Sequence, residues 1–327
     1  YVIANVGLLV DEGYDEVFLP AEDIDAVVCY PWTEQSMGIK HSNPWPPFTL
    51  DNDWEVERAA EFLMFINELV RITPRRKPVD FALGRLAASI FAEEAHPGCS
   101  VDIGIGLPEI ATRLLREGGL LDKIRSMTES GVSGGMPANG VFFGAAVGPT
   151  EIVSSAEAFR RIYKGLDVSI LGALEFDLAG NVNVSKRGEG AIHYVGPGGF
   201  IDITTNSNLI IFCSAWSNKA KIVLKNGQIQ VLSKSTPKLV EHVAEVTFNG
   251  AEALKAGKRV FYVTHIAAFR LTERGLELYR VMPGVDIQRD ILDVAPKGVI
   301  LPESGEVPVA APEVASGVGF KLDFTRK

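Results

Sequence analysis

The sequence predicts an α/β fold built on an open, mostly parallel sheet with flanking helices. The clearest signal lies in residues 100–127, where an apolar strand, a glycine turn, a helix and a second strand follow one another. That order indicates a βαβ unit, whose two strands run parallel. Two later apolar runs, Val168–Leu174 and Leu209–Cys213, are typical of strands buried inside such a sheet.

The first eighty residues predict two strands, a linker and a helix. Apolar residues favour strands over Tyr1–Val10 and Ile24–Cys29. Residues 31–47 contain four prolines, which suits a linker or a long loop. In Trp54–Ile72 the apolar side chains recur on one helical face, so we expect a helix that packs on the core of this chain rather than on a partner.

Residues that favour the ends of helices and strands delimit the elements around the βαβ unit. A second helix is expected over Asp80–Ala95, and the strand Ser100–Ile105 leads into the glycine turn Gly104–Pro108. Pro108 suits the first position of a helix, and Gly118-Gly119 suits its end.

The second half of the chain continues the α/β pattern. Asn226-Gly227 between two apolar runs is a strong hairpin signal. Strands are expected over Val260–His265 and Gly275–Met282, and a short helix over Asp286–Leu292. The tail from Leu301 has no clear period, so we expect it to be loose or draped over the surface.

The composition excludes several classes of protein. The 327 residues carry 32 Lys and Arg against 41 Asp and Glu, a net charge of −9, which disfavours a general nucleic-acid binder. The 3 cysteines show no C-x-x-C spacing, so a reducing compartment is expected: the cytoplasm, or the mitochondrial matrix in a eukaryote. Neither a membrane span nor a signal peptide is predicted.

Glu129 is the first candidate for a functional side chain. It follows an apolar strand and precedes a glycine-rich segment, residues 130–140. Ligands of parallel sheets bind beyond the carboxyl ends of the strands, where this carboxylate is expected to lie. The residues alone fit a solvated loop glutamate and a ligand-facing glutamate equally well.

Three loops are further candidates. Gly104-x-Gly106-x-x-Glu109 is a weak dinucleotide fingerprint, because a carboxylate replaces the third glycine and would repel a pyrophosphate. It fits a tight turn, or a backbone that lies against a different ligand. Residues 177–185, and residues 196–202, which we expect to feed a strand, offer amide and backbone N–H donors suited to an oxyanion, or are plain turns.

The order of these motifs resembles the second half of the family I coenzyme A transferases. It is most similar to the acetate or propionate branch, which has Glu-Ser-Gly, and the resemblance extends over about Gly98–Val299. It is carried by Asp102-Ile-Gly-Ile-Gly-Leu-Pro-Glu109, Thr128-Glu-Ser-Gly131, Gly134-Gly-Met-Pro-Ala138, Phe143-Gly-Ala-Ala146, Gly180-Asn-Val-Asn-Val-Ser185 and Gly198-Gly-Phe-Ile-Asp202.

The resemblance implies an acyl-CoA:carboxylate CoA-transferase for short-chain acids, with ping-pong kinetics through a glutamyl-CoA thioester on Glu129. Asn183 and the N–H of Gly199 would be the oxyanion donors. Coenzyme A and acyl-CoA would be substrates, with no permanently bound cofactor and no metal. The implied CoA-binding residues are Gly104, Ile105, Gly106, Leu107, Pro108, Gly198 and Lys219, and candidate liners of the acyl site are Met136, Phe142, Phe143 and Trp216.

The resemblance also implies a division of the chain. Single-chain members of the family carry two α/β halves, and no counterpart of the glycine loop of the first half precedes Gly104. We therefore expect residues 1–30 to be tail strands of an upstream half, 31–79 a linker with an added helix, 80–300 the catalytic domain and 301–327 an extension.

The upstream half would belong to the same gene product or to a partner chain, within a homo- or hetero-oligomer. Two alternatives to the transferase stay open. One is a CoA-ester or ring-opening hydrolase on the same fold, which uses Glu129 as a general base. The other is a CoA-binding subunit that is inactive without its partner.

Overall fold

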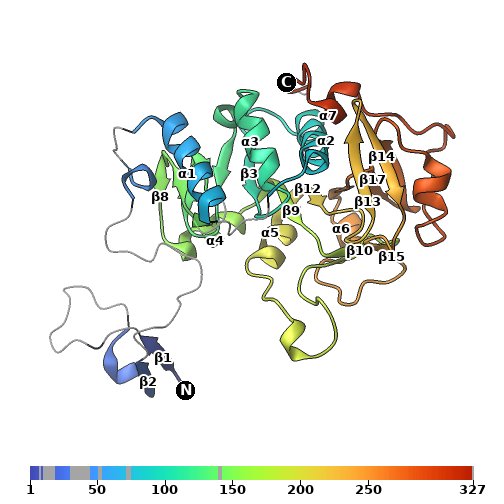
Figure 1. The fold of residues 1–327 in the computed structure, drawn as a ribbon. Coiled ribbons are helices and arrows are strands. Elements are labelled where there is room, and N and C mark those ends of the chain that lie inside the picture. Colours follow the sequence, from blue (N-terminus) through green and yellow to red (C-terminus); the bar gives the residue numbers. More distant parts are fainter. Residues whose placement is uncertain are drawn as a thin grey trace.

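The computed structural model describes residues 1–6, 9, 19–29, 45–50, 54–70, 75–138 and 142–325. Its main body is a nine-stranded sheet with flanking helices, so the predicted fold class is confirmed (Figure 1). In spatial order the strands are β18 (Gly275–Val281), β17 (Ala267–Thr272), β16 (Arg259–Val263), β12 (Ser207–Cys213), β9 (Leu166–Gly172), β3 (Ser100–Ile103), β4 (Arg125–Met127), β5 (Val132–Ser133) and β8 (Glu151–Ile152).

The sheet is parallel in its middle and antiparallel at both edges. β16, β12, β9, β3 and β4 pair in parallel. The predicted βαβ unit is present as β3, α3 (Glu109–Glu117) and β4. At the edges, β17 and β18, and likewise β5 and β8, pair antiparallel. The connections 264–266 and 273–274 are too short for a crossover, so β16, β17 and β18 can only form hairpins.

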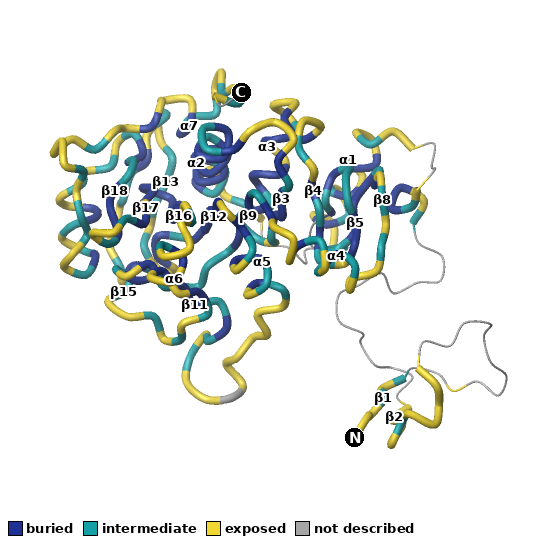
Figure 2. Tube along the Cα trace, turned by 180° about the vertical axis from the view of Figure 1, so that it is seen from behind, coloured by how far each residue is buried: buried dark blue, intermediate teal, exposed yellow. Residues whose placement is uncertain are grey.

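Helices cover both faces of the parallel strands (Figure 1). α2 (Pro78–Glu94) and α3 pack together on one face, and α4 (Ser155–Ile162) and α5 (Phe200–Asn206) lie on the other. Buried residues follow α2 and the central strands, which form the core (Figure 2). Other elements are α6 (Gly250–Lys255), β6 (Met136–Pro137), β7 (Ala146–Val147), η1 (Ala21–Asp23), η2 (Pro46–Phe48), η3 (Leu121–Lys123), η5 (Ala191–His193) and the π-helix η6 (Ile287–Leu292).

The predicted hairpin around Asn226-Gly227 is confirmed. β13 (Lys221–Lys225) and β14 (Gln228–Ser233) pair antiparallel across it. Asn226 has φ 53° and Gly227 has φ 72°, which is the pair of left-handed conformations that a two-residue hairpin turn requires.

The N-terminal elements form a separate two-stranded sheet. β1 (Ile3–Val6) and β2 (Ala26–Cys29) pair in parallel, away from the main body in Figure 1. Their apolar side chains are exposed; Ile3, for example, is 67% exposed. Residues 7, 8 and 10 of the first predicted strand, and residues 31–44 of the predicted linker, lie outside the described residues.

The added helix is α1 (Val56–Val70), and it packs on the core of this chain as predicted. Ala59, Ala60 and Leu63 are buried against residues of the glycine-rich segment 130–147. Residues 71 and 72 of the predicted helix lie outside the described part of the chain. Within that part, no helix has the length and apolar character needed to cross a bilayer.

The tail after Leu301 is not loose; it lies over the surface and is anchored at a few buried residues. A short helix, α7 (Pro312–Ser316), packs on α2, and Val314, Ala315 and Leu322 are buried. The guanidinium of Arg85 donates through Nε and Nη2 to the carbonyls of Val314 and Ala315, both at 2.7 Å. A five-residue helix held by backbone carbonyls leaves no hydrophobic period in the sequence.

Candidate active site

Most of the predicted site residues lie beyond the carboxyl ends of parallel strands; Asn183, Gly198 and Gly199 do not. The turn Gly104–Pro108 follows β3, Glu129 follows β4 after one residue, and Lys219 lies in the loop that follows β12. Residues 173 and 174 connect β9 to β10 (Glu175–Asp177) at the same edge. This edge is where an open parallel sheet binds ligands.

A sharp turn presents Glu129. The N–H of Gly131 donates to the carbonyl of Thr128 at 3.1 Å, directly after β4 ends. Gly131 has φ +103°, and a Cβ there would lie 1.9 Å from the carbonyl oxygen of Val153. Only glycine fits this position. The backbone geometry therefore accounts for the glycine in Glu-Ser-Gly, and no catalytic role is needed to explain it.

The structure brings Glu129 and Gly199 together. A Cβ built on Gly199 would lie 3.1 Å from Cγ and 3.2 Å from Oε1 of Glu129, and 3.0 Å from Cζ of Phe159. The glutamate side chain therefore lies directly against the glycine backbone. Gly198, next to it, has φ +57° and faces open space.

The segment after Gly199 differs from the prediction. We expected this loop to feed a strand, but it begins α5 at Phe200. The helix is only seven residues long, with Phe200, Ile203 and Thr204 buried, and the hydroxyl of Thr204 donates to the carbonyl of Phe200 at 2.8 Å. A helix of two turns is too short for its period to separate from that of a strand.

A second carboxyl, Asp102, lies near Glu129 and was missed by the sequence reasoning. Asp102 is only 2% exposed, in the middle of β3. Burial raises its pKa well above the usual range, and the negative charge of Glu129 raises it further. Burial also raises the pKa of Glu129. The available signal was an aspartate inside an apolar strand, since such residues are rarely buried without a reason.

The glycine turn is open to a ligand on one side. The N–H of Gly104 donates to the carbonyl of Ile170 at 2.9 Å, which ties the turn to β9. Gly106 has φ +90° with nothing within 4 Å of its would-be Cβ, and Ile105 is 44% exposed. Leu107 packs on the core and Pro108 is buried, so these two anchor the turn from beneath.

Asn183 is already engaged in local hydrogen bonds. It ends β11 (Val182–Asn183), is 1% exposed, and donates both amide hydrogens, to Oε1 of Glu175 at 2.9 Å and to the carbonyl of Lys186 at 2.8 Å. Its oxygen accepts from the N–H groups of Ser185 and Lys186. The amide therefore holds the 183–186 turn, and its predicted role as an oxyanion donor requires one of these bonds to open.

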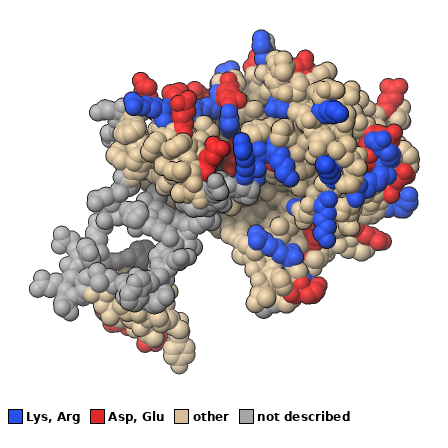
Figure 3. Space-filling view, in the orientation of Figure 1, with Lys and Arg blue, Asp and Glu red and all other residues tan. Residues whose placement is uncertain are grey.

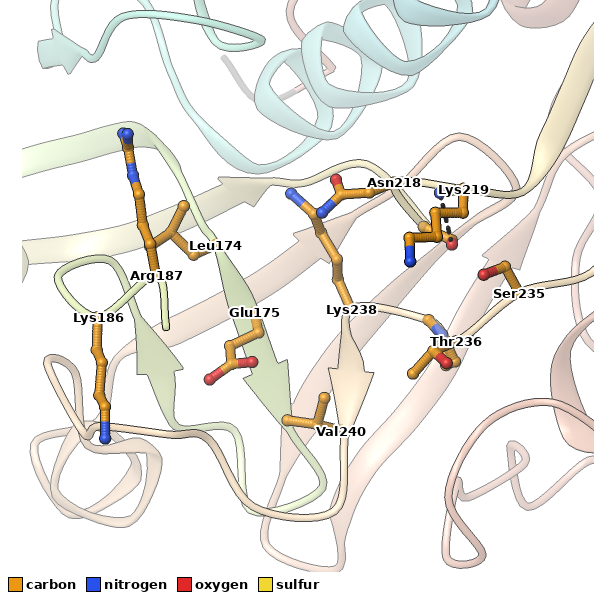
Figure 4. Close-up of a pocket in the computed structure, with 12 residues that line it drawn as sticks. Leu174, Glu175, Lys186, Arg187, Asn218, Lys219, Ser235, Thr236, Lys238 and Val240 are labelled. Atoms are coloured by element: carbon orange, nitrogen blue, oxygen red, sulfur yellow. Dashed lines mark hydrogen bonds between the residues drawn. The ribbon is translucent and has the colours of Figure 1, made fainter. Parts of the chain in front are cut away.

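Lys219 lines a cavity of about 610 Å³ that is rich in positive charge (Figure 4). Lys186, Arg187 and Lys238 share the lining, against the single carboxylate of Glu175. In Figure 4, Lys238 extends toward Asn218, whereas Lys186 and Arg187 extend in opposite directions. Burial lowers the pKa of Lys238, and Glu175 partly offsets this. Basic side chains also gather across the middle and right of the face in Figure 3.

Three of the four candidate acyl-site residues pack in hydrophobic clusters of the fold. Trp216 is 2% exposed and stacks on Phe269 with ring centroids 6.2 Å apart, so it belongs to the core. Met136 packs with Ala60 of α1, and Phe142 contacts Phe48 in the cluster beneath the same helix. Phe143 is half-buried.

Comparison with known proteins gives consistent relatives. No protein-family model matches the chain. Caffeate CoA-transferase of Acetobacterium woodii is 33% identical over 208 residues, which are 62% of this chain and 39% of the relative. Acetate CoA-transferase YdiF of Escherichia coli (strain K12) is 36% identical over 203 residues, 61% of this chain and 38% of the relative. The aligned region thus spans about two fifths of these relatives.

Solved structures extend the likeness to nearly all of the chain. The crystal structure of acyl-CoA transferase (YdiF) apoenzyme from Escherichia coli O157:H7 matches with a TM-score of 0.70 at 26% identity, covering 98% of this chain and 57% of that one. The thioester complex of the same transferase with CoA matches at 0.71. The decarboxylase AibA/AibB, at 0.53 and 16% identity, shares the fold alone.

Proposed function

We propose that this chain, as a member of the CoA-transferase family, carries the catalytic half of an acyl-CoA:carboxylate CoA-transferase for short-chain acids. The observation that carries the proposal is the placement of Glu129 against Gly199, beyond the carboxyl end of β4. Glutamate at a strand end, partly dehydrated and packed against backbone, fits a covalent nucleophile better than it fits a solvated loop residue.

The proposed reaction transfers CoA from one carboxylic acid to another through covalent intermediates on Glu129. A carboxylate oxygen of Glu129 attacks the thioester carbonyl, the carbon–sulfur bond breaks, and an acyl-glutamyl anhydride and CoA thiolate form. The thiolate then attacks the glutamyl carbonyl, which releases the first acid as a carboxylate and leaves a glutamyl-CoA thioester. A second carboxylate reverses the sequence, so the thioester bond is conserved and the kinetics are ping-pong.

The surroundings of Glu129 support this role in two ways. A carboxylate is a poor nucleophile in water, and partial burial removes the hydration that weakens it. Each tetrahedral intermediate places negative charge on an oxygen beside Gly199, whose N–H is our proposed donor. One such donor typically contributes about 3 kcal/mol. We retain Asn183 as a second donor, on the condition that its bond to Glu175 or Lys186 opens.

The CoA substrate would occupy two further features. The glycine turn Gly104–Pro108 suits a close approach of the pantetheine arm to backbone at Gly106, where no side chain stands and nothing lies within 4 Å of the would-be Cβ. The basic cavity, through Lys219 and Lys238, suits the phosphates of CoA. The turn follows β3 and Lys219 follows β12, each beyond the carboxyl end of a parallel strand, as Glu129 follows β4.

The active assembly would need more than this chain. The aligned region spans only about two fifths of the curated relatives, and β1 and β2 form a parallel pair with exposed apolar side chains. We propose that residues 1–30 complete an upstream half supplied by the same gene product or a partner chain, within an oligomer. Residues 31–79 would be the linker with α1, 80–300 the catalytic domain, 301–327 its extension, and the cytoplasm its location.

Trapping the intermediate tests the proposal. The chain, in its complete assembly, is incubated with a short-chain acyl-CoA and then with borohydride, which reduces a glutamyl thioester to an alcohol. Peptide mass analysis should place the reduction at Glu129, and E129Q should abolish it. Glu157, a half-buried glutamate of α4 paired with Arg161, gives the matched control E157Q, which should label normally. An unmarked Glu129 in the complete assembly would refute the proposal.

The same experiment separates the transferase from the hydrolase. A transferase releases the first acid once per active site, holds the thioester until a second carboxylic acid is added, and only then releases a new acyl-CoA. A hydrolase that uses Glu129 as a general base releases acid and CoA with water alone and leaves no reducible thioester.

A further inference from the structure

We propose that Asp102 is a positioning residue for Glu129: a neutral carboxyl group that, together with Ser169, forms a buried polar support beneath the reactive glutamate. The proposal rests on the proposed function, because it assigns Asp102 a part in preparing the Glu129 nucleophile.

Strand register places the two residues beneath Glu129. Asp102 of β3 pairs with Ser169 of β9 on one side and with Met127 of β4 on the other, all in parallel strands. Paired residues of parallel strands project from the same face. Glu129 lies two residues after Met127, one step further toward the carboxyl end of the sheet.

The polar atoms of this support are buried without partners. Oδ2 of Asp102 and Oγ of Ser169 make no hydrogen bond to any described residue, although both side chains are buried. Leaving such an atom unpaired costs about 1–3 kcal/mol, so two of them on paired positions call for a ligand that they share. Glu129, whose negative charge acts on Asp102, or a water molecule that bridges to it, is the partner that we propose.

Charge decides which form Asp102 takes. On the same face, one step earlier along the strands, lie Arg125, which is exposed, and Asp167, which accepts hydrogen bonds from the N–H and hydroxyl of Ser100. Neither supplies a cation to the Asp102–Glu129 pair. Two like charges in a dehydrated site repel strongly, and a single proton removes the repulsion. Asp102 is the more deeply buried carboxyl, and its pKa is raised well above the usual range, so it holds the proton.

A neutral Asp102 keeps Glu129 ionised and gives it a hydrogen-bond donor. The O–H of Asp102 can hold one oxygen of the Glu129 carboxylate, directly or through water, and later the carbonyl oxygen of the glutamyl thioester. The proton stays on Asp102 throughout, so the balance of the transfer reaction is unchanged. An ionised Asp102 would instead push the proton onto Glu129 and remove the nucleophile.

A spectroscopic measurement tests the protonation state without requiring turnover. Infrared difference spectra of the intact chain near neutral pH should show the C=O stretch of a protonated carboxylic acid that is lost in D102N and retained in E129Q. Retention of the band in D102N, or its absence from the wild-type chain, would overturn the proposal.

Kinetics in the complete assembly test the positioning role. Asparagine keeps a neutral donor, so D102N should retain kcat within about threefold, whereas D102L should lose kcat about 30- to 100-fold with KM for acyl-CoA unchanged. S169A should lower kcat less than D102L and change the melting temperature little, because no described residue hydrogen-bonds the hydroxyl and only the proposed contact toward Glu129 is lost. Ser207 is equally buried but donates to the carbonyl of Ile203 at 2.8 Å, so the control S207A should lower the melting temperature and leave kcat unchanged.

Two outcomes would contradict the positioning role. One is D102L with wild-type kcat, and the other is D102N as impaired as D102L while both remain folded. Failure of the wild-type assembly to form any thioester on Glu129 would instead refute the proposed function, so the two failures are distinguishable.

Discussion

The region around Glu129 and the basic cavity around Lys238 contrast in charge and in access to water. The first holds two carboxyl groups close enough to raise the pKa of Asp102, beside glycine backbone; among the described residues, no cation contributes to the pKa of either carboxyl. The second holds three lysines and an arginine around about 610 Å³ of open space, with one glutamate.

The contrast separates reactivity from binding. A group becomes reactive when water is removed and its charge is left incompletely compensated, which is unfavourable for folding. A phosphate anchor needs several donors that remain hydrated until the ligand arrives, which costs the folded state little. Substitutions near Glu129 should therefore act on kcat and on stability, whereas substitutions in the cavity should act on KM.

The largest effect is expected from G199A. Gly199 has φ −75° and ψ 2°, which alanine accepts, but the new Cβ would lie 3.0–3.2 Å from Phe159 and Glu129. Glu129 must shift, and we expect kcat to fall about 100-fold while the melting temperature changes little. The control is G196A, because a Cβ at Gly196 meets nothing within 4 Å. Equal activity of both variants would show that Glu129 does not need its place against Gly199.

The next effect concerns stability. The pKa of Asp102 is raised in the folded state, so the unfolded chain releases this proton at a lower pH than the folded chain does. Stability should therefore fall as pH rises above the ordinary aspartate range, by up to about 1.4 kcal/mol per pH unit. D102N lacks the proton and should lose less. Urea unfolding of both chains between pH 5 and 8 measures the difference, and parallel curves would contradict it.

The smallest effect is expected in the cavity. K238M keeps most of the side-chain volume and removes one charge, so KM for the CoA ester should rise about fivefold with kcat unchanged. The rise should shrink at high salt, because ionic strength screens the remaining charges. Lys255, exposed and paired with Glu252 on α6, provides the control K255M. A fall in kcat without a change in KM would contradict the assignment of binding to the cavity and reactivity to the region around Glu129.

Two residues show how much of the candidate site can be predicted from the sequence. Glu129 and Gly199 were both predicted as site residues, and the structure places them in contact although they are 70 positions apart. That agreement came from the order of motifs, because neither composition nor periodicity links the two. The strand and hairpin predictions held where apolar runs were long or turn chemistry was specific, as at Asn226-Gly227.

The misses share a physical cause. Asp102 is part of the motif Asp102–Glu109. The motif does not reveal that the carboxyl is buried near Glu129, with Oδ2 lacking a hydrogen-bond partner among the described residues. The bonds of Asn183 depend on where Glu175 lies after folding. α5 and α7 are shorter than the window in which a helical period can be detected, and Arg85 anchors α7 through carbonyls that every residue has.

The anchoring of α7 also bears on how the protein is made. Arg85 lies in α2, the most enclosed helix, and its carbonyl partner Val314 is 229 residues further along the chain. During synthesis α2 leaves the ribosome long before Val314 has been added to the chain. The Arg85 guanidinium and the apolar surface around it therefore stay exposed to water in the nascent chain. Contacts of such long range slow folding, and they place the closure of the α2 layer after Ala315 has emerged. Nascent chains stalled before Val314 should therefore engage chaperones through α2, and chains stalled well beyond Leu322 should not.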